Sequence, residues 1–374
     1  MTLIAALTLL IWIGMATLRG GFWAMREVDA NSDAPDPSHW PPVIAIVPAR
    51  DEAQVIARSI ASLAAQDYPG DFRIILIDDN SSDGTNNIAR QAGGKRLTVL
   101  SGAPLAPGWT GKLWAVSQGI AAAGDAPKYL WLTDADIAHS PDNLRRLVAR
   151  AEAGGLTMAS LMARLNCTSL AERALIPAFV FFFQLLYPFA QVNRPGTPGA
   201  AAGGCMLVKR EALATSGGIA AIRAALIDDC ALGANLKQQG PIWLGLTDRA
   251  LSIRPYPHFA DVAAMISRSA YAQLHYNPLL LGGTLAGLAL VYLSPPLIAL
   301  TASGPALWLA LATWGLMALL FQPILRVYRR SPLWGIALPA IAAFYSGCTL
   351  LSAWQHMRGR GGMWKGRAQA AAGR

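Results

Sequence analysis

Four short acidic clusters in the first two-thirds of the chain constrain its fold more than any other feature. They are Asp51-Glu52, Asp78-Asp79, Asp134-Ala135-Asp136 and Asp228-Asp229. The first three follow short apolar runs that are typical of strands, at 43–47, 74–77 and 129–132. Because the carboxyl ends of parallel strands line one crevice of an open α/β sheet, we expect these three clusters to lie together.

Crowded carboxylates repel one another unless a cation or a positive substrate group lies among them. A divalent metal that also holds a diphosphate would meet this need, because Mg²⁺ and Mn²⁺ prefer carboxylate and phosphate oxygens. The clusters therefore predict an enzyme that uses a nucleotide-activated substrate.

The composition indicates membrane segments, because 53% of the 374 residues are hydrophobic and only 14% are charged. The formal net charge is +9, which in a membrane protein marks cytoplasmic faces. No basic stripe with interleaved aromatic residues is present, so we expect no nucleic-acid partner. The four cysteines form no Cys-x-x-Cys pair, which argues against a disulfide framework or a zinc site.

The apolar run at 2–18 is followed by Arg19 and Arg26, which indicates a retained anchor rather than a cleaved signal peptide. The basic flank should stay in the cytoplasm, with the N-terminus outside and the body of the protein inside. Three more runs of roughly membrane-spanning length, ~20 residues, close the chain. They are 279–301, 305–322 and 334–354.

The number of crossings stays open. A cytoplasmic loop with Arg326, Arg329 and Arg330 makes the first two closing runs a hairpin. A third crossing would export the basic tail, so either the last run is re-entrant or interfacial, or the count differs by one.

A further apolar run, 174–192, contains Pro177, Gln184 and Pro188. A crossing there would separate the third acidic cluster from the fourth. We interpret this run as interfacial, with an internal core helix as the alternative.

The predicted fold class is α/β, with a mostly parallel Rossmann-like sheet, an N-terminal membrane anchor and C-terminal transmembrane helices. Expected helices include 51–66, with Ile56, Ile60 and Leu63 on one face, and 140–153, opened by Ser140-Pro141. The expected domains are a 1–28 anchor, a 42–257 catalytic domain, a 258–278 interfacial connector, 279–355 membrane segments and a 356–374 basic tail.

Each motif has a functional and a plain structural interpretation. Asp79 could bind a ribose or a base, or Asp78-Asp79 could simply form a capped turn. Lys112, behind glycines at a helix start, suits a diphosphate, although a surface loop is as plausible. Gly203-Gly204 lets a sugar or acceptor approach the backbone closely, or is a plain loop.

The two remaining acidic motifs carry more weight. Asp134 and Asp136 would point the same way in an extended strand and could share one ion, the alternative being a turn with solvated acids. Asp228-Asp229 opens a helical run, where a single acid would suffice as N-cap. A partly buried second acid would have the raised pKa that suits a general base.

The order of these motifs resembles the family-2 glycosyltransferases of GT-A fold over most of 42–268. The resemblance rests on Val47-Pro48-Ala49-Arg50-Asp51-Glu52, Asp78-Asp79-x-Ser-x-Asp-Gly-Thr, Gly111-Lys112, Asp134-x-Asp136 and Asp228-Asp229. Within that family the chain is similar to hopene-associated glycosyltransferases of bacterial hopanoid gene clusters. This closer likeness rests on the tracts 108–119, 176–183 and 225–232 and on Trp364-Lys365-Gly366-Arg367, which is also similar to other lipid-modifying members.

The resemblance implies a role for each matching position. Asp51, Glu52 and Asp79 would surround the base and ribose. Lys112 and Asp134 would lie near the diphosphate, and Asp136, with Asp134, would hold Mg²⁺ or Mn²⁺. Asp229 would be the general base beside Asp228, which replaces the family's Glu.

One departure bears on the product. Where processive synthases carry Gln-x-x-Arg-Trp, this chain has Met265-Ile-Ser-Arg268-Ser269, so only Arg268 remains as a diphosphate contact. That favours a single transfer over polymer synthesis.

The resemblance thus implies an inverting, membrane-bound hexosyltransferase. It would move a sugar from a nucleotide-diphosphate donor, with a UDP-sugar favoured, to a hopanoid or related isoprenoid lipid. It would be a multi-pass protein of the bacterial inner membrane, with its catalytic domain facing the cytoplasm. The alternative is a non-catalytic membrane scaffold that binds a nucleotide sugar and recruits hopanoid enzymes. A nucleotidyltransferase fits less well, because no Gly-rich loop follows the first strand. A transporter fits less well, because no membrane run has an ionisable residue inside it.

Overall fold

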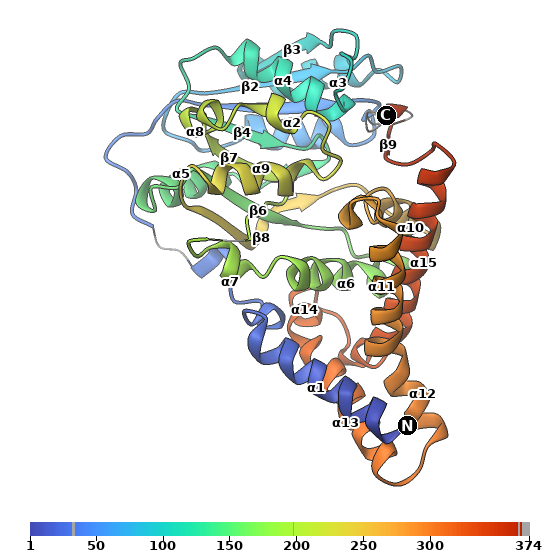
Figure 1. Ribbon diagram of the computed structural model, residues 1–374. Helices are drawn as coiled ribbons and strands as arrows, with labels where there is room; N and C mark the ends of the chain where they lie inside the picture. The colour runs from blue at the N-terminus through green and yellow to red at the C-terminus, as the bar shows by residue number, and fades with distance from the viewer. Residues whose placement is uncertain (32–33, 197, 366, 369–374) are drawn as a thin grey trace. The chain divides into compact units, whose positions relative to one another are not determined.

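The computed structural model describes residues 1–31, 34–196, 198–365 and 367–368, and it divides into two compact units (Figure 1). The helical unit comprises Met1–Arg26, Cys167–Ala190 and Tyr256–Gly362. The sheet unit comprises Glu27–Asn166, Gln191–Pro255 and the chain from Met363 onward. This division differs from the expected domains in two places. Residues 167–190, expected in the catalytic domain, belong to the helical unit, and the chain from Met363, expected in the basic tail, belongs to the sheet unit. Gly366 and the tail 369–374 lie outside the described residues.

An eight-stranded sheet of order β3-β2-β1-β4-β7-β6-β8-β5 forms the sheet unit. The strands are β1 (Val43–Ala49), β2 (Phe72–Asp78), β3 (Leu97–Ser101), β4 (Tyr129–Thr133), β5 (Ile137–His139), β6 (Met158–Arg164), β7 (Cys205–Lys209) and β8 (Ile242–Ser252). Neighbours from β3 to β4 pair in parallel, as do β6 and β8, while β7 and β5 run antiparallel to their partners. The predicted α/β, mostly parallel sheet is therefore confirmed.

The helices of the sheet unit are α2 (Ile56–Ala64), α3 (Thr85–Gly93), α4 (Gly111–Ala123), α5 (Asn143–Ala153), α8 (Arg210–Thr215) and α9 (Asp228–Lys237). Every residue of β1 is buried, as expected for a parallel strand covered on both faces. Ile56, Ile60 and Leu63 are fully buried in the same core, which confirms the predicted inner face of α2.

Two predicted helix starts were wrong. Residues from Asp51 form a loop before α2 begins at Ile56, because Asp51 itself has a left-handed backbone, with φ of 50°. Ser140 is not the N-cap of α5, since its carbonyl accepts the Asn143 amide at 3.0 Å in a turn and Asp142 is the N-cap.

The helical unit contains α1 (Thr2–Leu18), α6 (Leu170–Leu186), α10 (Phe259–Ser267), α11 (Pro278–Leu288), α12 (Ser294–Thr301), α13 (Gly304–Leu320), α14 (Gln322–Val327) and α15 (Leu338–Met357). Among the described residues, three stretches are helical, long and apolar enough to cross a membrane: Leu170–Val192, Pro278–Thr301 and Gly304–Val327. The expected N-terminal anchor, α1, is shorter, and α15 is not one of the three.

Helix α6 packs against α10, α14 and α15 within the helical unit. Its N-terminus has a capping box, in which the Ser169 hydroxyl accepts the Glu172 amide at 3.1 Å and the Glu172 carboxylate accepts the Ser169 amide at 2.8 Å. Ten of its residues are buried, Pro177 among them, which favours an internal helix over the interfacial interpretation.

Gly119 provides a test of how α4 packs on the sheet. A Cβ at this position would lie 2.5 Å from Cγ2 of Ile46 in β1. We expect Gly119→Val to lower the stability of the full-length protein by about 1–3 kcal/mol through overpacking. Thermal unfolding should show a lower midpoint than Ala121→Val, a control on the exposed face of the same helix. Equal midpoints would contradict this packing.

Candidate active site

The predicted site residues of the sheet unit come from the ends of elements. Three strands, β1, β2 and β4, end on the same edge of the sheet, and the loops that follow them carry Asp51 and Glu52, Asp79, and Asp134 and Asp136. Two helices begin there, so that Lys112 is the second residue of α4 and Asp228 and Asp229 open α9. Thr110 caps α4 by accepting the Leu113 amide at 3.3 Å.

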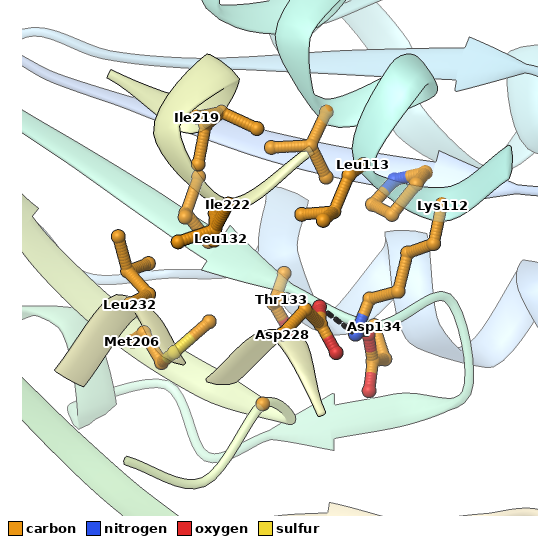
Figure 2. Close-up of a pocket in the computed structure, with 13 residues that line it drawn as sticks. Lys112, Leu113, Leu132, Thr133, Asp134, Met206, Ile219, Ile222, Asp228 and Leu232 are labelled. Carbon is orange, nitrogen blue, oxygen red and sulfur yellow. Dashed lines mark ion pairs between the residues drawn. The ribbon is translucent and has the colours of Figure 1, made fainter. Parts of the chain in front are cut away.

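Lys112 lies beside both Asp134 and Asp228 (Figure 2). Its Nζ is 2.9 Å from Oδ1 of Asp134 and 3.0 Å from Oδ2 of Asp228. Burial alone would lower the pKa of Lys112, but the two carboxylates outweigh it and raise this pKa above its ordinary value. The pKa of Asp134 is raised by burial and by Asp136, against the opposing pull of Lys112. This lysine therefore joins acids from two separate motifs.

Asp229 is held by backbone donors. Its Oδ2 accepts the Gly203 amide at 2.9 Å, and its Oδ1 accepts the Cys230 amide at 2.8 Å. A side chain at position 203 would meet this carboxylate at 3.3 Å, so glycine allows the close approach. Burial and the charge of Asp228 raise the pKa of Asp229 to about 6, in spite of these hydrogen bonds and Lys112. A carboxylate with that pKa can take up a proton near neutral pH.

Asp136 has a different cation partner. Nε of Arg254, just after β8, is 2.7 Å from Oδ2 of Asp136, and its guanidinium also pairs with Glu52. Lys365 approaches the other oxygen of Glu52 at 3.0 Å. Burial raises the pKa of Glu52, and the two cations oppose that shift.

The loops after β1 and β2 are joined directly. The Asp51 amide donates to Oγ of Ser81 at 2.9 Å, and the Ser82 amide donates to Oδ1 of Asp51 at 2.8 Å. The Asp79 amide donates to the Ala49 carbonyl at 2.8 Å. Asp51, Glu52 and Asp79 thus lie on one edge, as their positions after parallel strands predict.

A pocket opens beside the Lys112–Asp228 ion pair and encloses about 320 Å³, its mouth included. Lys112, Asp134 and Asp228 form its ionic end (Figure 2). Its walls are apolar side chains of α4, β4, β7, the turn Ile219–Ile222 and α9: Leu113, Val116, Leu132, Met206, Ile219, Ile222 and Leu232.

The Asp-x-Asp motif departs from its predicted geometry. Strand β4 ends at Thr133, and a turn follows in which the Ile137 amide donates to the Asp134 carbonyl at 3.3 Å. The two acids are therefore not extended, and each has its own cation. Within the described ranges, no group of three or more His, Cys, Asp or Glu side chains is arranged to hold a metal.

Two further cations are Arg268, which the sequence predicts for the site, and Arg254, which it does not. Arg268 belongs to the helical unit, at the C-cap of α10, and its diphosphate role stays a prediction. Arg254 was missed, because a single arginine after a strand matches no motif. The one signal in the sequence was that the four acidic clusters contain more carboxylates than the assigned cations, Lys112 and Arg268, can balance.

Comparison with known proteins supports the fold and the class of enzyme. Residues 44–217 match the family model described as Glycosyl transferase family 2. The mannosyltransferase PcManGT from Pyrobaculum calidifontis, solved with GDP-Man and Mn²⁺, has a TM-score of 0.61 and 21% identity over 95% of this chain and 99% of that one. Glucosyl-3-phosphoglycerate synthase from Mycobacterium tuberculosis has a TM-score of 0.42 and 20% identity over 63% of this chain and 79% of that one. No curated protein matches the sequence.

Residues 44–217 are thus similar to the family 2 glycosyltransferases, and the fold of the chain is of the GT-A type. This similarity supports a hexosyltransferase activity, so the predicted class of enzyme is confirmed.

The role of Lys112 in holding the acids together can be tested by stability. Lys112→Met should lower the stability of the nucleotide-free protein by about 1–3 kcal/mol, because it leaves partly buried carboxylates without their cation. Adding Asp228→Asn should restore part of that loss. Lys128→Met, at a lysine that is 43% exposed and pairs with Glu152, should cost less in the same thermal scans. A loss no larger than that of the control would contradict the role of Lys112.

Proposed function

We propose that this chain is a membrane-bound, inverting glycosyltransferase that moves a hexose from a nucleoside-diphosphate donor to a lipid hydroxyl. The observation that carries the proposal is the joint position of Lys112, Asp134 and Asp229 at one edge of the sheet. Asp229, the proposed general base, has a raised pKa and lies there beside a cation and a strand-end acid. These are the groups that acid–base chemistry on a charged donor requires.

A divalent metal, Mg²⁺ or Mn²⁺, fits the pair Asp134 and Asp136. Such ions use one or two carboxylates and complete their coordination with substrate phosphates and water. The described residues offer no larger set of ligands, so the diphosphate would supply the rest. The Mn²⁺ and GDP-Man named for PcManGT support this donor class, and the resemblance to hopene-associated enzymes favours a UDP-sugar here.

In the proposed mechanism, Asp229 accepts the proton of the acceptor hydroxyl. The freed oxygen attacks the anomeric carbon from the side opposite the diphosphate, and the bond from that carbon to the diphosphate oxygen breaks with inversion. Lys112 and, as a prediction, Arg268 would stabilise charge on the leaving group. The bound metal would supply further charge neutralisation at the diphosphate. Asp51, Glu52 and Asp79 would orient the nucleoside.

A membrane location and a lipid acceptor are supported by the helical unit. Large apolar side chains stand exposed on four of its helices, which a soluble protein avoids: Leu3, Leu279, Leu300 and Trp308 are at least 70% exposed. The hopanoid or isoprenoid identity of the acceptor rests on the sequence resemblance. Lipid mass spectrometry of cells with and without the protein tests it, since one product should carry one additional hexose.

Asp229→Asn should reduce kcat by ~10²–10⁴-fold, because it removes the base, while nucleotide-sugar binding persists. The assay measures nucleoside-diphosphate release from UDP- and GDP-hexoses with membrane lipid as acceptor. In the wild type, kcat/KM should fall about tenfold per pH unit below about pH 6, because Asp229 must be deprotonated to act. Asp125→Asn, at an exposed surface acid, is the control. Near-normal turnover of Asp229→Asn would refute the assignment.

Asp136→Ala should abolish metal-dependent nucleotide binding. Titration calorimetry with UDP or GDP would show tighter binding with Mn²⁺ than without it in the wild type, and no such difference in the variant. Asp71→Ala, at a surface acid, should behave as wild type. If Mn²⁺ still strengthens binding to Asp136→Ala, the acid is no metal ligand.

A further inference from the structure

Lys365 comes after the last helix of the helical unit, yet it belongs to the sheet unit and contacts the loop after β1. Its Nζ is 3.0 Å from Oε1 of Glu52 and 2.9 Å from the carbonyl oxygen of Asp51. Its own carbonyl accepts Nε of Arg50 at 3.2 Å. One residue from the far end of the chain thus contacts three consecutive residues of this loop.

These contacts begin a chain of ion pairs that crosses the site. Lys365 pairs with Glu52, Glu52 pairs with Arg254, and Arg254 pairs with Asp136. Glu52 is only 7% exposed, and a buried carboxylate is costly unless cations and hydrogen bonds compensate its charge. Lys365 supplies one of the two cations that pair with Glu52. The guanidinium of Arg254 supplies the other and also pairs with Asp136.

The loop needs such support because its backbone is strained. Asp51 has a φ of 50°, a left-handed conformation that residues other than glycine adopt uncommonly. The loop keeps this conformation through its contacts with Ser81, Ser82 and Lys365. The same loop carries Asp51 and Glu52, which are predicted to bind the nucleoside.

We propose that Lys365 is a positioning residue of the donor site. It holds the Asp51-Glu52 loop in its nucleoside-binding conformation, and through Glu52 and Arg254 it holds Asp136 toward the diphosphate. The inference rests on the proposed function in one respect, the identity of the ligand as a nucleoside diphosphate.

The test uses the full-length protein in detergent, with UDP and GDP titrated in the presence of Mn²⁺. Lys365→Ala should weaken binding at least tenfold and raise the donor KM by a similar factor, with kcat at saturating donor changed less than threefold. Lys365→Arg should bind within about threefold of the wild type, because it can still pair with Glu52. Arg360→Ala, at an exposed cation nearby in the sequence, should have no effect. Wild-type or tighter binding by Lys365→Ala would overturn the proposal.

A second measurement needs no ligand and separates this inference from the proposed function. Trypsin should cut after Lys365 more slowly than after Arg360, and Glu52→Gln should speed the cut at Lys365 alone. If the wild type binds neither nucleotide, the proposed function fails, and this comparison still decides whether Lys365 is docked. Equal rates at Lys365 in wild type and Glu52→Gln would overturn the docking.

Discussion

The repulsion between carboxylates at the carboxyl edge of the sheet is the constraint on which the rest of the structure depends. Asp134 and Asp228 come from different elements, and a single ammonium group, that of Lys112, lies within 3.0 Å of both. To place it there, α4 must begin beside the end of β4 and face the start of α9. Glycine at position 203 lets the Asp229 carboxylate approach the backbone there closely. Asp229 therefore has a raised pKa although the Gly203 and Cys230 amides both donate to its carboxylate.

Two cations of the site each pair with two acids. Lys112 pairs with Asp134 and Asp228, while Arg254 pairs with Asp136 and Glu52. The protein itself therefore balances much of the charge of these acids. In the proposed function, Asp134 and Asp136 would hold a divalent ion that arrives with the donor, and this ion would supply the missing positive charge. On this proposal, the two acids would serve one donor site although each pairs with its own cation.

Much of this edge could be predicted from the sequence, since runs of buried strand residues followed by acids have one geometry in a parallel sheet. The inner face of α2 and the position of Asp228-Asp229 at a helix start were also predictable, because both depend on local sequence pattern. Arg254 and Lys365 were not, because their pairing depends on chain segments that only the fold brings together. Lys365 lies 314 residues from Asp51, whose carbonyl it binds. The sequence also could not tell whether α6 is an internal or an interfacial helix, because an apolar helix has the same composition inside a protein and at a membrane.

The most direct test of the account is an experimental structure of the protein with Mn²⁺ and a nucleoside diphosphate. Anomalous scattering should place the metal roughly 2 Å from a carboxylate oxygen of Asp136 or Asp134, with the diphosphate bound to it and Lys112 close by. Asp229 should then face the space next to the terminal phosphate, where the sugar would lie. A metal or diphosphate bound away from this edge of the sheet would contradict the account.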